Sequence, residues 1–478
     1  MTEPAASVTQ QLAEVLAATT VGALPDVALE GAQRAVIDWA GSAIAGALEG
    51  PARLSQRVVA GLGRSDEATV LAAGRASAAG AALANGVAAH ILELDDIHKA
   101  STVHAAAPVI AAALAVAERE HASGARFMLA VVLGYEAALR IGEAVNPSHY
   151  RYWHPTGTAA TFGAAAAAGS LIGLRAEAMR DALGSAGTQA AGLWEFNADG
   201  AMSKHLHPGK AAFNGILAAD LARLGFTGAR RILEGDRGFF RAMSGSHDAS
   251  RVTAGLGERW KIVENCYKLH SCCGHTHTAI DLALGLRVDG RLADGEAGTP
   301  VAGRVAARVA SIDIETYGPG YAIVREGNPR TPYQAKFSLA YCVAVALLEG
   351  RVGLEQFAPE RFGPDGPRDA ATRALLARTR VAVRDDLTAR YPAAWPARLA
   401  VTLETGDVLA GACEFPRGNP ENPIDTEALE GKMVALLEPR FGADVAQRVL
   451  TTVRSLGSRI DMATAFRDIV PDAARATA

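Results

Sequence analysis

Apolar residues recur at helical spacing through most of the first 250 positions. Leu12, Val15 and Leu16, for example, follow the i, i+3, i+4 rule of an amphipathic helix. The pattern predicts one or two helices over 8–46, interrupted near 22–25, and further helices over 78–92, 108–119, 124–145, 159–174, 176–183 and 208–224. Strand-like alternation is absent from the sequence before about residue 300. We therefore expect an all-helical domain over 1–266, most simply built from antiparallel helix pairs.

The pattern of hydrophobic positions changes near residue 300. β-Branched residues alternate with other residues over 301–317, and 380–383, 398–404 and 408–415 are also typical of strands. Thr405-Gly406-Asp407 favours a hairpin turn between the last two, and helical patterns occupy 336–348 and 372–378. We expect a smaller α+β domain over 267–418. Residues 419–478, helical over 426–437 and 443–456, should return to the helical domain. The predicted fold class is mostly α with an α+β second domain.

Composition and charge narrow the classes of function. A chain of 478 residues is longer than one hydrophobic core usually organises. The net charge of −4 comes without a basic stripe, which argues against a nucleic-acid partner. Five cysteines, two of them adjacent, favour a reducing compartment over a disulfide framework. The N-terminus lacks the pattern of a signal peptide, and the weakly apolar run over 157–173 is typical of a buried helix. We expect a cytoplasmic protein without a membrane partner.

The segment over 90–108 concentrates groups that transfer protons. Its carboxylates and imidazoles are Glu93, Asp95, Asp96, His90, His98 and His104. His104 precedes a helix that Pro108 helps to start, and the positive end of a helix favours a neutral imidazole that accepts a proton. The alternative is that His104 caps the helix and the carboxylates solvate a loop. The density of the cluster favours the functional interpretation.

Two further segments join histidines to helix starts. His154 precedes a helix of small residues, for which Thr156 or Thr158 is the predicted N-cap, and the exposed amides there suit a carboxylate. Over 200–210, Lys204 lies among basic residues before a helix predicted to start at Pro208, which favours an anion site. The alternatives are a packed aromatic loop, a solvated basic loop, or a Schiff-base lysine for pyridoxal phosphate without its phosphate cup.

The last segment, over 267–277, reads YKLHSCCGHTH. Its three histidines, His270, His275 and His277, and two cysteines suggest zinc, but the paired C-x-x-C of a zinc ribbon or finger is missing, so we predict no metal. A packed loop is the other interpretation. Walker, dinucleotide-binding, G-x-S-x-G and H-E-x-x-H motifs are also missing from the sequence. The four segments rich in histidine and lysine suit general acid–base catalysis on a small anionic substrate, with cations that bind its carboxylates.

These segments together resemble the MmgE/PrpD family, which includes 2-methylcitrate dehydratase, cis-aconitate decarboxylase and iminodisuccinate epimerase. The matching motifs are ANGVAAH over 84–90, LDD over 94–96, WHPTGTAATFGAAAAAG over 153–169, MSK over 202–204, HPGKAAFNG over 207–215, KLHSCCGHTH over 268–277 and RGNPENP over 417–423. The resemblance covers nearly the whole chain. It implies a large helical domain, a smaller α+β lid, a site between them, a homodimer and no obligatory cofactor.

The resemblance also implies site residues. The predicted catalytic residues are Asp95, Asp96, His104, His154, Lys204, His275 and, from spacing alone, Tyr317. The predicted substrate-binding residues are Glu93, Lys268, His270 and His277, together with Thr156, Arg325 and Arg330, which are predicted from their residue types and not from the resemblance. Decarboxylase-like members usually read D-F-D-D-T and then His-Pro-Ser, where this chain has E-L-D-D-I over 93–97 and His104-Ala-Ala. A longer acid and a lost hydroxyl would reshape the pocket.

The expected function is a cofactor-independent lyase, either a dehydratase or a decarboxylase, of a small di- or tricarboxylate. One alternative is an epimerase or isomerase of a dicarboxylate, which needs two opposed acid–base groups and no leaving group. A second is a metal-dependent hydrolase that uses His270, His275, His277 and an aspartate. A third is a helical scaffold that binds carboxylates without turnover.

Overall fold

The chain forms two compact units in the computed structural model, which describes residues 7–290, 292–294, 300–467 and 469. The first unit comprises the described residues up to Ile91, Asp95–Cys266, and those from Asp425 onward. The second comprises Leu92–Leu94 and Tyr267–Ile424. The short segment Leu92–Leu94 therefore belongs to the second unit, although the sequence on both sides of it belongs to the first.

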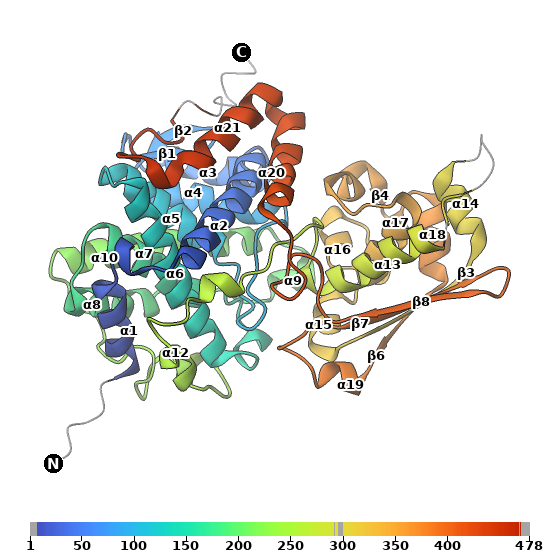
Figure 1. Cartoon of the computed structure of the whole chain (residues 1–478), viewed down its shortest axis with the longest axis horizontal. Coiled ribbons are helices and arrows are strands. Elements are labelled where there is room, and N and C mark those ends of the chain that lie inside the picture. Colours follow the sequence, from blue (N-terminus) through green and yellow to red (C-terminus); the bar gives the residue numbers. More distant parts are fainter. Residues whose placement is uncertain (1–6, 291, 295–299, 468, 470–478) are drawn as a thin grey trace. The chain divides into compact units, whose positions relative to one another are not determined.

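The first unit is built almost entirely from helices (Figure 1). They are α1 Val8–Ala18, α2 Asp26–Gly46, α3 Gly50–Gly61, α4 Ala78–Ile91, α5 Ala106–Arg119, α6 Gly124–Val145, α7 Ala159–Leu171, α8 Ala176–Gly187, α9 Phe196–Asp199, α10 Ser203–Arg223, α11 Phe239–Met243, α12 Ser250–Thr253, α20 Thr426–Phe441 and α21 Ala443–Ser455. A short antiparallel pair, β1 Ala68–Val70 and β2 Gly74–Ala76, corrects the expectation that strands begin only near residue 300. Strands of three residues are too short to show alternation.

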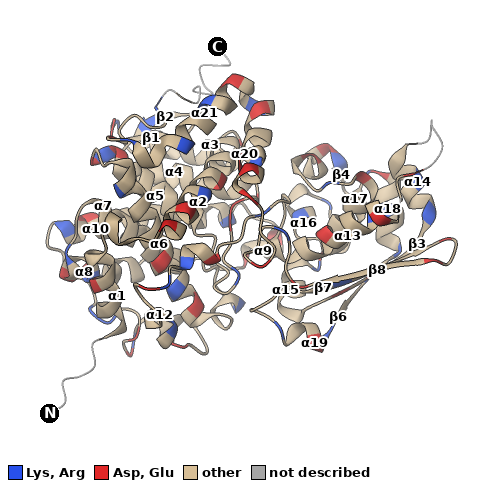
Figure 2. Ribbon diagram, viewed as in Figure 1, with Lys and Arg blue, Asp and Glu red and all other residues tan. Residues whose placement is uncertain are grey.

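Small residues let the central helices approach closely. Helices α4, α5 and α7 carry few charges and are almost uniformly tan in Figure 2. A Cβ atom placed on Gly163 of α7 would lie 2.5 Å from the backbone oxygen of Gly134 and 2.7 Å from the Cβ of Ala138, both on α6. Backbones this close leave no room for a side chain, which explains why the sequence uses Gly and Ala here.

A methyl group at this contact should therefore destabilise the first unit. We expect Gly163→Ala to lower the free energy of unfolding by about 1–3 kcal/mol, because the added Cβ forces the two helices apart. Gly431→Ala in α20 is the matched control: a Cβ there meets nothing within 4 Å, and the change should stabilise the protein by about 0.5–1 kcal/mol. Urea unfolding of both variants measures the effects. Equal stability of Gly163→Ala and the wild type would contradict the packing argument.

The second unit is a sheet covered by helices. Strands β3 Val309–Thr316, β6 Thr379–Val383, β7 Ala397–Leu403 and β8 Val408–Cys413 are ordered β6-β3-β7-β8. β3 pairs with β6 in parallel, and the other pairs are antiparallel. The remaining elements are α13 His277–Asp289, α14 Val301–Arg308, α15 Gly318–Val324, α16 Pro332–Lys336, α17 Leu339–Glu349, β4 Phe362–Gly363, β5 Gly366–Pro367, α18 Ala370–Ala377 and α19 Asp385–Thr388. Helices α13 and α17 pack together and against the sheet (Figure 1).

Local pattern accounts for most of this unit. The hairpin of β7 and β8 turns at Gly406, which has φ +91°, as the Thr-Gly-Asp sequence predicts. The strand predicted over 301–317 is wrong in its first half, because 301–308 form helix α14. Its buried residues Val305 and Ala306, followed by Val309, have helical spacing, and regular alternation starts only in β3. The predicted fold class, mostly α with an α+β second domain, is confirmed.

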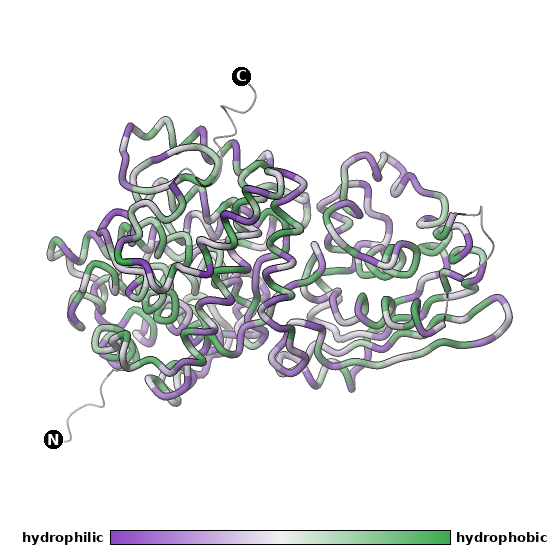
Figure 3. Tube along the Cα trace, turned by 45° about the horizontal axis from the view of Figure 1, so that its top comes forward, coloured by the Kyte–Doolittle hydropathy of each residue, from purple (hydrophilic) through white to green (hydrophobic). Residues whose placement is uncertain are grey.

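Hydrophobic and hydrophilic positions are interspersed along the trace in Figure 3. Within the part of the chain that the structure describes, every helix is too short or too polar to cross a bilayer.

Candidate active site

The turn from α4 to α5 brings an aspartate and several imidazoles together in the first unit. Nδ1 of His90, near the end of α4, lies 2.6 Å from Oδ2 of Asp95, and both side chains are fully buried. The ring of His104 is 4.9 Å from that of His90, and its Nδ1 is 3.6 Å from the same Asp95 oxygen. A buried carboxylate needs a counter-charge or a hydrogen-bond donor, and His90 supplies it.

Asp96, the next residue, has a positioning role. Its carboxylate accepts hydrogen bonds from the Tyr135 hydroxyl at 2.5 Å, the Asn265 amide at 2.9 Å and the backbone N–H of Ala106 at 3.1 Å. Its backbone oxygen lies 2.6 Å from Nδ1 of His104. A carbonyl only accepts, so His104 carries a proton on Nδ1 and directs the lone pair of its Nε2 elsewhere. Asp96 thus fixes both the start of α5 and the tautomer of His104.

Asp96 also makes stability depend on pH. Burial raises the pKa of Asp96 to about 7, although the Tyr135 hydrogen bond lowers it in part. The unfolded chain releases this proton near pH 4 and the folded protein only near pH 7, so the folded state loses stability as the pH rises between them. We expect a loss of about 2–4 kcal/mol over that window. Urea unfolding at pH 4.5 and 7.5, compared between wild type and Asp96→Asn, isolates this contribution. A pH dependence identical in both proteins would contradict it.

His154 lies beside this group. Its ring stacks on that of His90 at 5.4 Å, and its Nδ1 is 3.1 Å from Nδ1 of His207. One proton is shared between these two nitrogens, because one must donate and the other accept. Burial lowers the pKa of both imidazoles, to about 4 for His207 and well below the usual range for His154, and the charge of Lys204 adds to the effect. His154 is therefore neutral at pH 7 and able to accept a proton.

Lys204 lies in the first turn of α10. The prediction that this helix starts at Pro208 was wrong. The helix begins at Ser203 and contains Pro208, so Lys204 and His207 are helical and do not lie in a preceding loop. Pro208 lacks the N–H that would bond to the carbonyl of Lys204, but one lost bond near a helix start is tolerated. Lys204 is 2% exposed. The helix thereby places an ammonium group near His154.

Of the two predicted N-caps of α7, Thr158 occupies the N-cap position. Thr158 precedes the helix, but within the described chain its side chain makes no capping bond; its hydroxyl is 2.7 Å from Nε2 of His149. The hydroxyl of Thr156 accepts the backbone N–H of His104 at 3.0 Å. Both threonines are fully buried. Thr156 therefore holds the backbone of His104.

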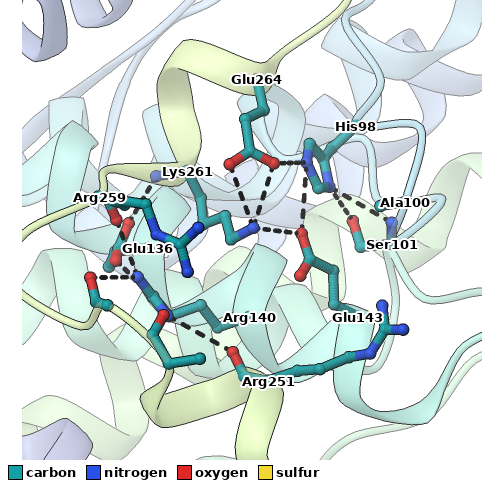
Figure 4. Close-up of polar contacts among 12 residues, drawn as sticks. His98, Ala100, Ser101, Glu136, Arg140, Glu143, Arg251, Arg259, Lys261 and Glu264 are labelled. Carbon is teal, nitrogen blue, oxygen red and sulfur yellow. Dashed lines mark hydrogen bonds and ion pairs between the residues drawn. The ribbon is translucent and has the colours of Figure 1, made fainter. Parts of the chain in front are cut away.

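A polar network anchors the connection between α4 and α5 at His98 (Figure 4). Nε2 of His98 lies 3.4 Å from Glu264 and 3.6 Å from Glu143, and its Nδ1 is 2.9 Å from the Ser101 hydroxyl. The ammonium of Lys261 is 2.8 Å from Glu143 and 3.1 Å from Glu264. Burial alone would raise the pKa of Glu264, but the bonds from His98 and Lys261 lower it to about 2. These contacts anchor the middle of the segment that ends in His104.

Arg140 extends the network into the core (Figure 4). It pairs with Glu136, and its guanidinium donates to the backbone oxygens of Ala254 at 2.9 Å and Arg259 at 2.8 Å. The other oxygen of Glu136 accepts the backbone N–H of Lys261 at 2.8 Å. The pair therefore positions the segment that supplies Glu264 and Asn265, and Asn265 in turn binds Asp96.

Two groups in the described part of the chain have the composition of a metal site. The first is His90, Asp95 and His104; the second is His98, Glu143 and Glu264. In the first, the short His90–Asp95 bond and the bond from His104 to the Asp96 carbonyl already use the δ nitrogens. In the second, the Lys261 ammonium stands where a cation would bind. Hydrogen bonds and ion pairs thus use part of the ligand atoms of each group, while Nε2 of His90 is buried without a hydrogen-bond partner in the described chain.

Other predicted site residues lie in the second unit. Nδ1 of His275 is 2.7 Å from the Tyr317 hydroxyl, and burial lowers the pKa of His275 to about 3. The ammonium of Lys268 is 3.5 Å from the Glu93 carboxylate. All four side chains are buried. The second unit thus has its own buried set of an acid, an ammonium, an imidazole and a phenol.

The other predicted substrate-binding residues of the second unit are two histidines and two arginines. His270 pairs with Asp281 at 2.9 Å, and the ring of His277 lies 5.0 Å from that of His270. His275 binds Tyr317 instead, so in the described chain these three histidines do not form the metal site of the hydrolase alternative. Arg325 and Arg330 are exposed.

Three histidines near Asp95 were missed as site residues. His90, His205 and His207 lie in or beside the imidazole group, with the ring of His205 6.3 Å from that of His90. Local signals existed, because His90 lies near the end of an apolar helix five residues before Asp95, and the other two directly precede the predicted start at Pro208. Neither signal specifies the partner.

Comparison with known proteins assigns the chain to a protein family. The model of the MmgE/PrpD N-terminal domain matches residues 10–252, and that of the C-terminal domain matches 270–458. Human cis-aconitate decarboxylase is 25% identical over 460 residues, 94% of this chain and 92% of that protein. The cis-aconitate decarboxylase-like protein oryM of Aspergillus oryzae is 27% identical over 403 residues, 80% of each chain. Cis-aconitate decarboxylase of Aspergillus terreus is 30% identical over 296 residues, 58% of each chain. The protein is thus an enzyme, and it belongs to the MmgE/PrpD family.

Proposed function

We propose that this enzyme is a cofactor-independent lyase, a dehydratase or a decarboxylase, that acts on a small di- or tricarboxylate. The observation that carries the proposal is the buried set of His90, His104 and His154 around Asp95, with Lys204 beside it. Neutral imidazoles move protons at pH 7, and an ammonium group binds a carboxylate. The cis-aconitate decarboxylases among its relatives support the same class of reaction.

The chemistry assigned to these side chains is general acid–base catalysis. In a dehydratase, His104 or His154 removes the proton alpha to a carboxylate, and the hydroxyl leaves as water with a proton from an acid. In a decarboxylase, CO2 leaves, and an imidazole that has first taken up a proton from solvent delivers that proton to the carbon. Lys204 holds a carboxylate next to these groups and stabilises the charge that develops there. In the second unit, Tyr317 and His275 are bonded to each other as a separate acid–base pair.

Proton NMR in heavy water tests the proposal directly. The enzyme is incubated with 2-methylcitrate, citrate, cis-aconitate and an amino dicarboxylate, each in a separate sample. Loss of the substrate's signals with new olefinic signals establishes a lyase, and CO2 release then identifies decarboxylation. Exchange of the alpha proton without a new product indicates the epimerase and contradicts the proposal. A chelator in a parallel sample should leave the rate unchanged, whereas the hydrolase alternative requires a loss.

The assembly and location remain predictions. We propose a homodimer in the cytoplasm, on the family resemblance and the cysteine usage. Light scattering of the purified enzyme should give twice the mass of one chain, and the mass of a single chain would contradict the dimer.

A further inference from the structure

In the first unit, His154 and His207 face each other through equivalent ring nitrogens. Nδ1 of His154 lies 3.1 Å from Nδ1 of His207, and the planes of the two rings differ by 46°. The proton between the two nitrogens can belong to either ring. If His154 donates it, Nε2 of His154 carries a lone pair and is a base; if His207 donates it, Nε2 of His154 carries a proton and is an acid. The pair therefore has two neutral arrangements, which differ in the role of His154.

The backbone of two loops holds the pair together. The backbone N–H of His154 donates to the carbonyl of Gly192 at 2.8 Å. A Cβ atom on Gly192 would lie 3.2 Å from Nδ1 of His207, and one on Gly157 would lie 3.1 Å from the Cβ of His207. Glycine at both positions lets the backbone approach the His207 side chain closely. The first turns of α10 supply His207 itself, so three segments distant in sequence fix the contact.

Aromatic rings lie beside both imidazoles. The ring of Trp194 is 5.1 Å from that of His154, and the ring of Phe196 is 5.4 Å from that of His207. Within the described residues, the contact between the Nδ1 atoms is the hydrogen bond that each of the two side chains makes. Nε2 of each ring therefore remains available to exchange a proton. His207 is 9% exposed and His154 is 2% exposed, so His207 is the ring with more access to solvent.

A charged imidazole is unfavourable at either position. Burial is the main cause of the low pKa of both rings, and the pKa of His207 falls to about 4. The other titratable groups that act on the two rings are His90, His104, Lys204 and Lys210. A second proton on His154 would create a buried positive charge near the ammonium of Lys204, which costs free energy. Moving the Nδ1 proton away as the Nε2 proton arrives avoids that charge.

We propose that His207 is a positioning residue that acts through His154 as a proton relay. Nε2 of His154 takes the proton from the substrate carbon, and the electron pair of the C–H bond stays on the carbon. The Nδ1 proton of His154 moves to Nδ1 of His207, and the Nε2 proton of His207 leaves to solvent. Both rings are neutral before and after the transfer, and His154 has changed from a base to an acid. When a carbon is protonated instead, each step runs in reverse. The inference rests on the proposed function, because it requires proton transfer at His154.

Chemical rescue of a truncated His207 tests the relay in the full-length enzyme. His207→Gly removes the equivalent of 4-methylimidazole, and kcat for the acid identified by NMR should fall about 10²-fold, with KM changed by less than about twofold. Added 4-methylimidazole should raise kcat of this variant about tenfold or more, because both of its ring nitrogens exchange protons. 1-Methylimidazole is an isomer with one ring nitrogen blocked. It accepts the Nδ1 proton of His154 but has no ring proton to release, so it should leave kcat low.

His207→Asn separates the relay from a role in holding the ring of His154. The asparagine amide can hydrogen-bond to Nδ1 of His154 but does not pass a proton on, so kcat should again fall about 10²-fold. The loss should not add to that of His154→Gln in a double variant, because His207 acts through His154. His121→Gly is the matched control: His121 is exposed and has φ +50°, which suits glycine, and its turnover should match the wild type with or without either base.

Several outcomes would overturn the relay alone. They are normal kcat in His207→Asn, a loss that multiplies with that of His154→Gln, and rescue of His207→Gly by both isomers equally or by neither. In each case the wild type still turns over the acid, so the proposed function stands. The measurements on His207→Asn do not require His207→Gly to fold. If the wild type turns over none of the acids, the proposed function fails and the inference fails with it.

Discussion

Replacing His154 with glutamine is expected to lower kcat/KM by about 10²–10⁴-fold. Glutamine fills a similar space but does not take up a proton at pH 7, so the acid–base group is lost while the packing is largely kept. Burial and the neighbouring imidazoles hold the pKa of His154 well below its usual range, which is why the wild-type ring is the neutral base. Turnover of the acid identified by NMR and thermal unfolding measure both parts of this expectation.

Lys204→Met should cause a similar loss for a different reason. Lys204 supplies the positive charge beside the imidazoles, and methionine keeps its length without the charge. His121→Gln is the control, since His121 is an exposed histidine that pairs with Asp461, and its turnover should match the wild type. Near-normal activity in both His154→Gln and Lys204→Met would rule out the acid–base assignment.

Asp95→Asn is expected to lower kcat by about 10²-fold or more. The Asp95 carboxylate accepts the Nδ1 proton of His90 at 2.6 Å, which fixes the ring and its tautomer. The asparagine side chain has the same shape, but its amide group can donate towards Nδ1 and favour the other tautomer. The ring of His90 lies against those of His104 and His154, so both the orientation and the charge of the group would change.

A double-mutant cycle makes this expectation specific. If Asp95 acts through His90, then His90→Gln and Asp95→Asn should each lower kcat, and the double variant should be no worse than the poorer single variant. The pH dependence of kcat should shift in the same direction in both single variants. Asp461→Asn breaks the exposed aspartate–histidine pair with His121 and should leave turnover unchanged. Losses that multiply in the double variant would show that the two residues act independently.

Pattern in the sequence was reliable where one local rule decided the structure. The alternation in β7 matches a strand with one buried face, and the glycine in the turn before β8 has the positive φ that a hairpin needs. Errors occurred where two rules competed. Residues 301–308 satisfy helical and strand spacing over a short window, and Pro208 marks a helix start by rule but lies inside α10.

The candidate site was predictable in part for the same reason. Dense acid–His segments on helix boundaries pointed to Asp95, His104 and His154, because chemistry is commonly placed on such connections. His207 was missed, although its Nδ1 is 3.1 Å from that of His154. The two residues are 53 positions apart, and no local pattern relates them. The placement of Glu93 in the second unit, two residues before Asp95 of the first, was equally invisible.

The sequence by itself determined the classes: a helical domain with an α+β partner, the MmgE/PrpD family, and a supply of imidazoles, carboxylates and lysines for acid–base work. Only the tertiary structure decided which group meets which. Asp95 binds an imidazole, whereas its neighbour Asp96 binds a phenol, an amide and a helix start. The physical reason is range: a hydrogen bond needs its atoms within about 3 Å, and packing between helices distant in sequence sets positions to that precision.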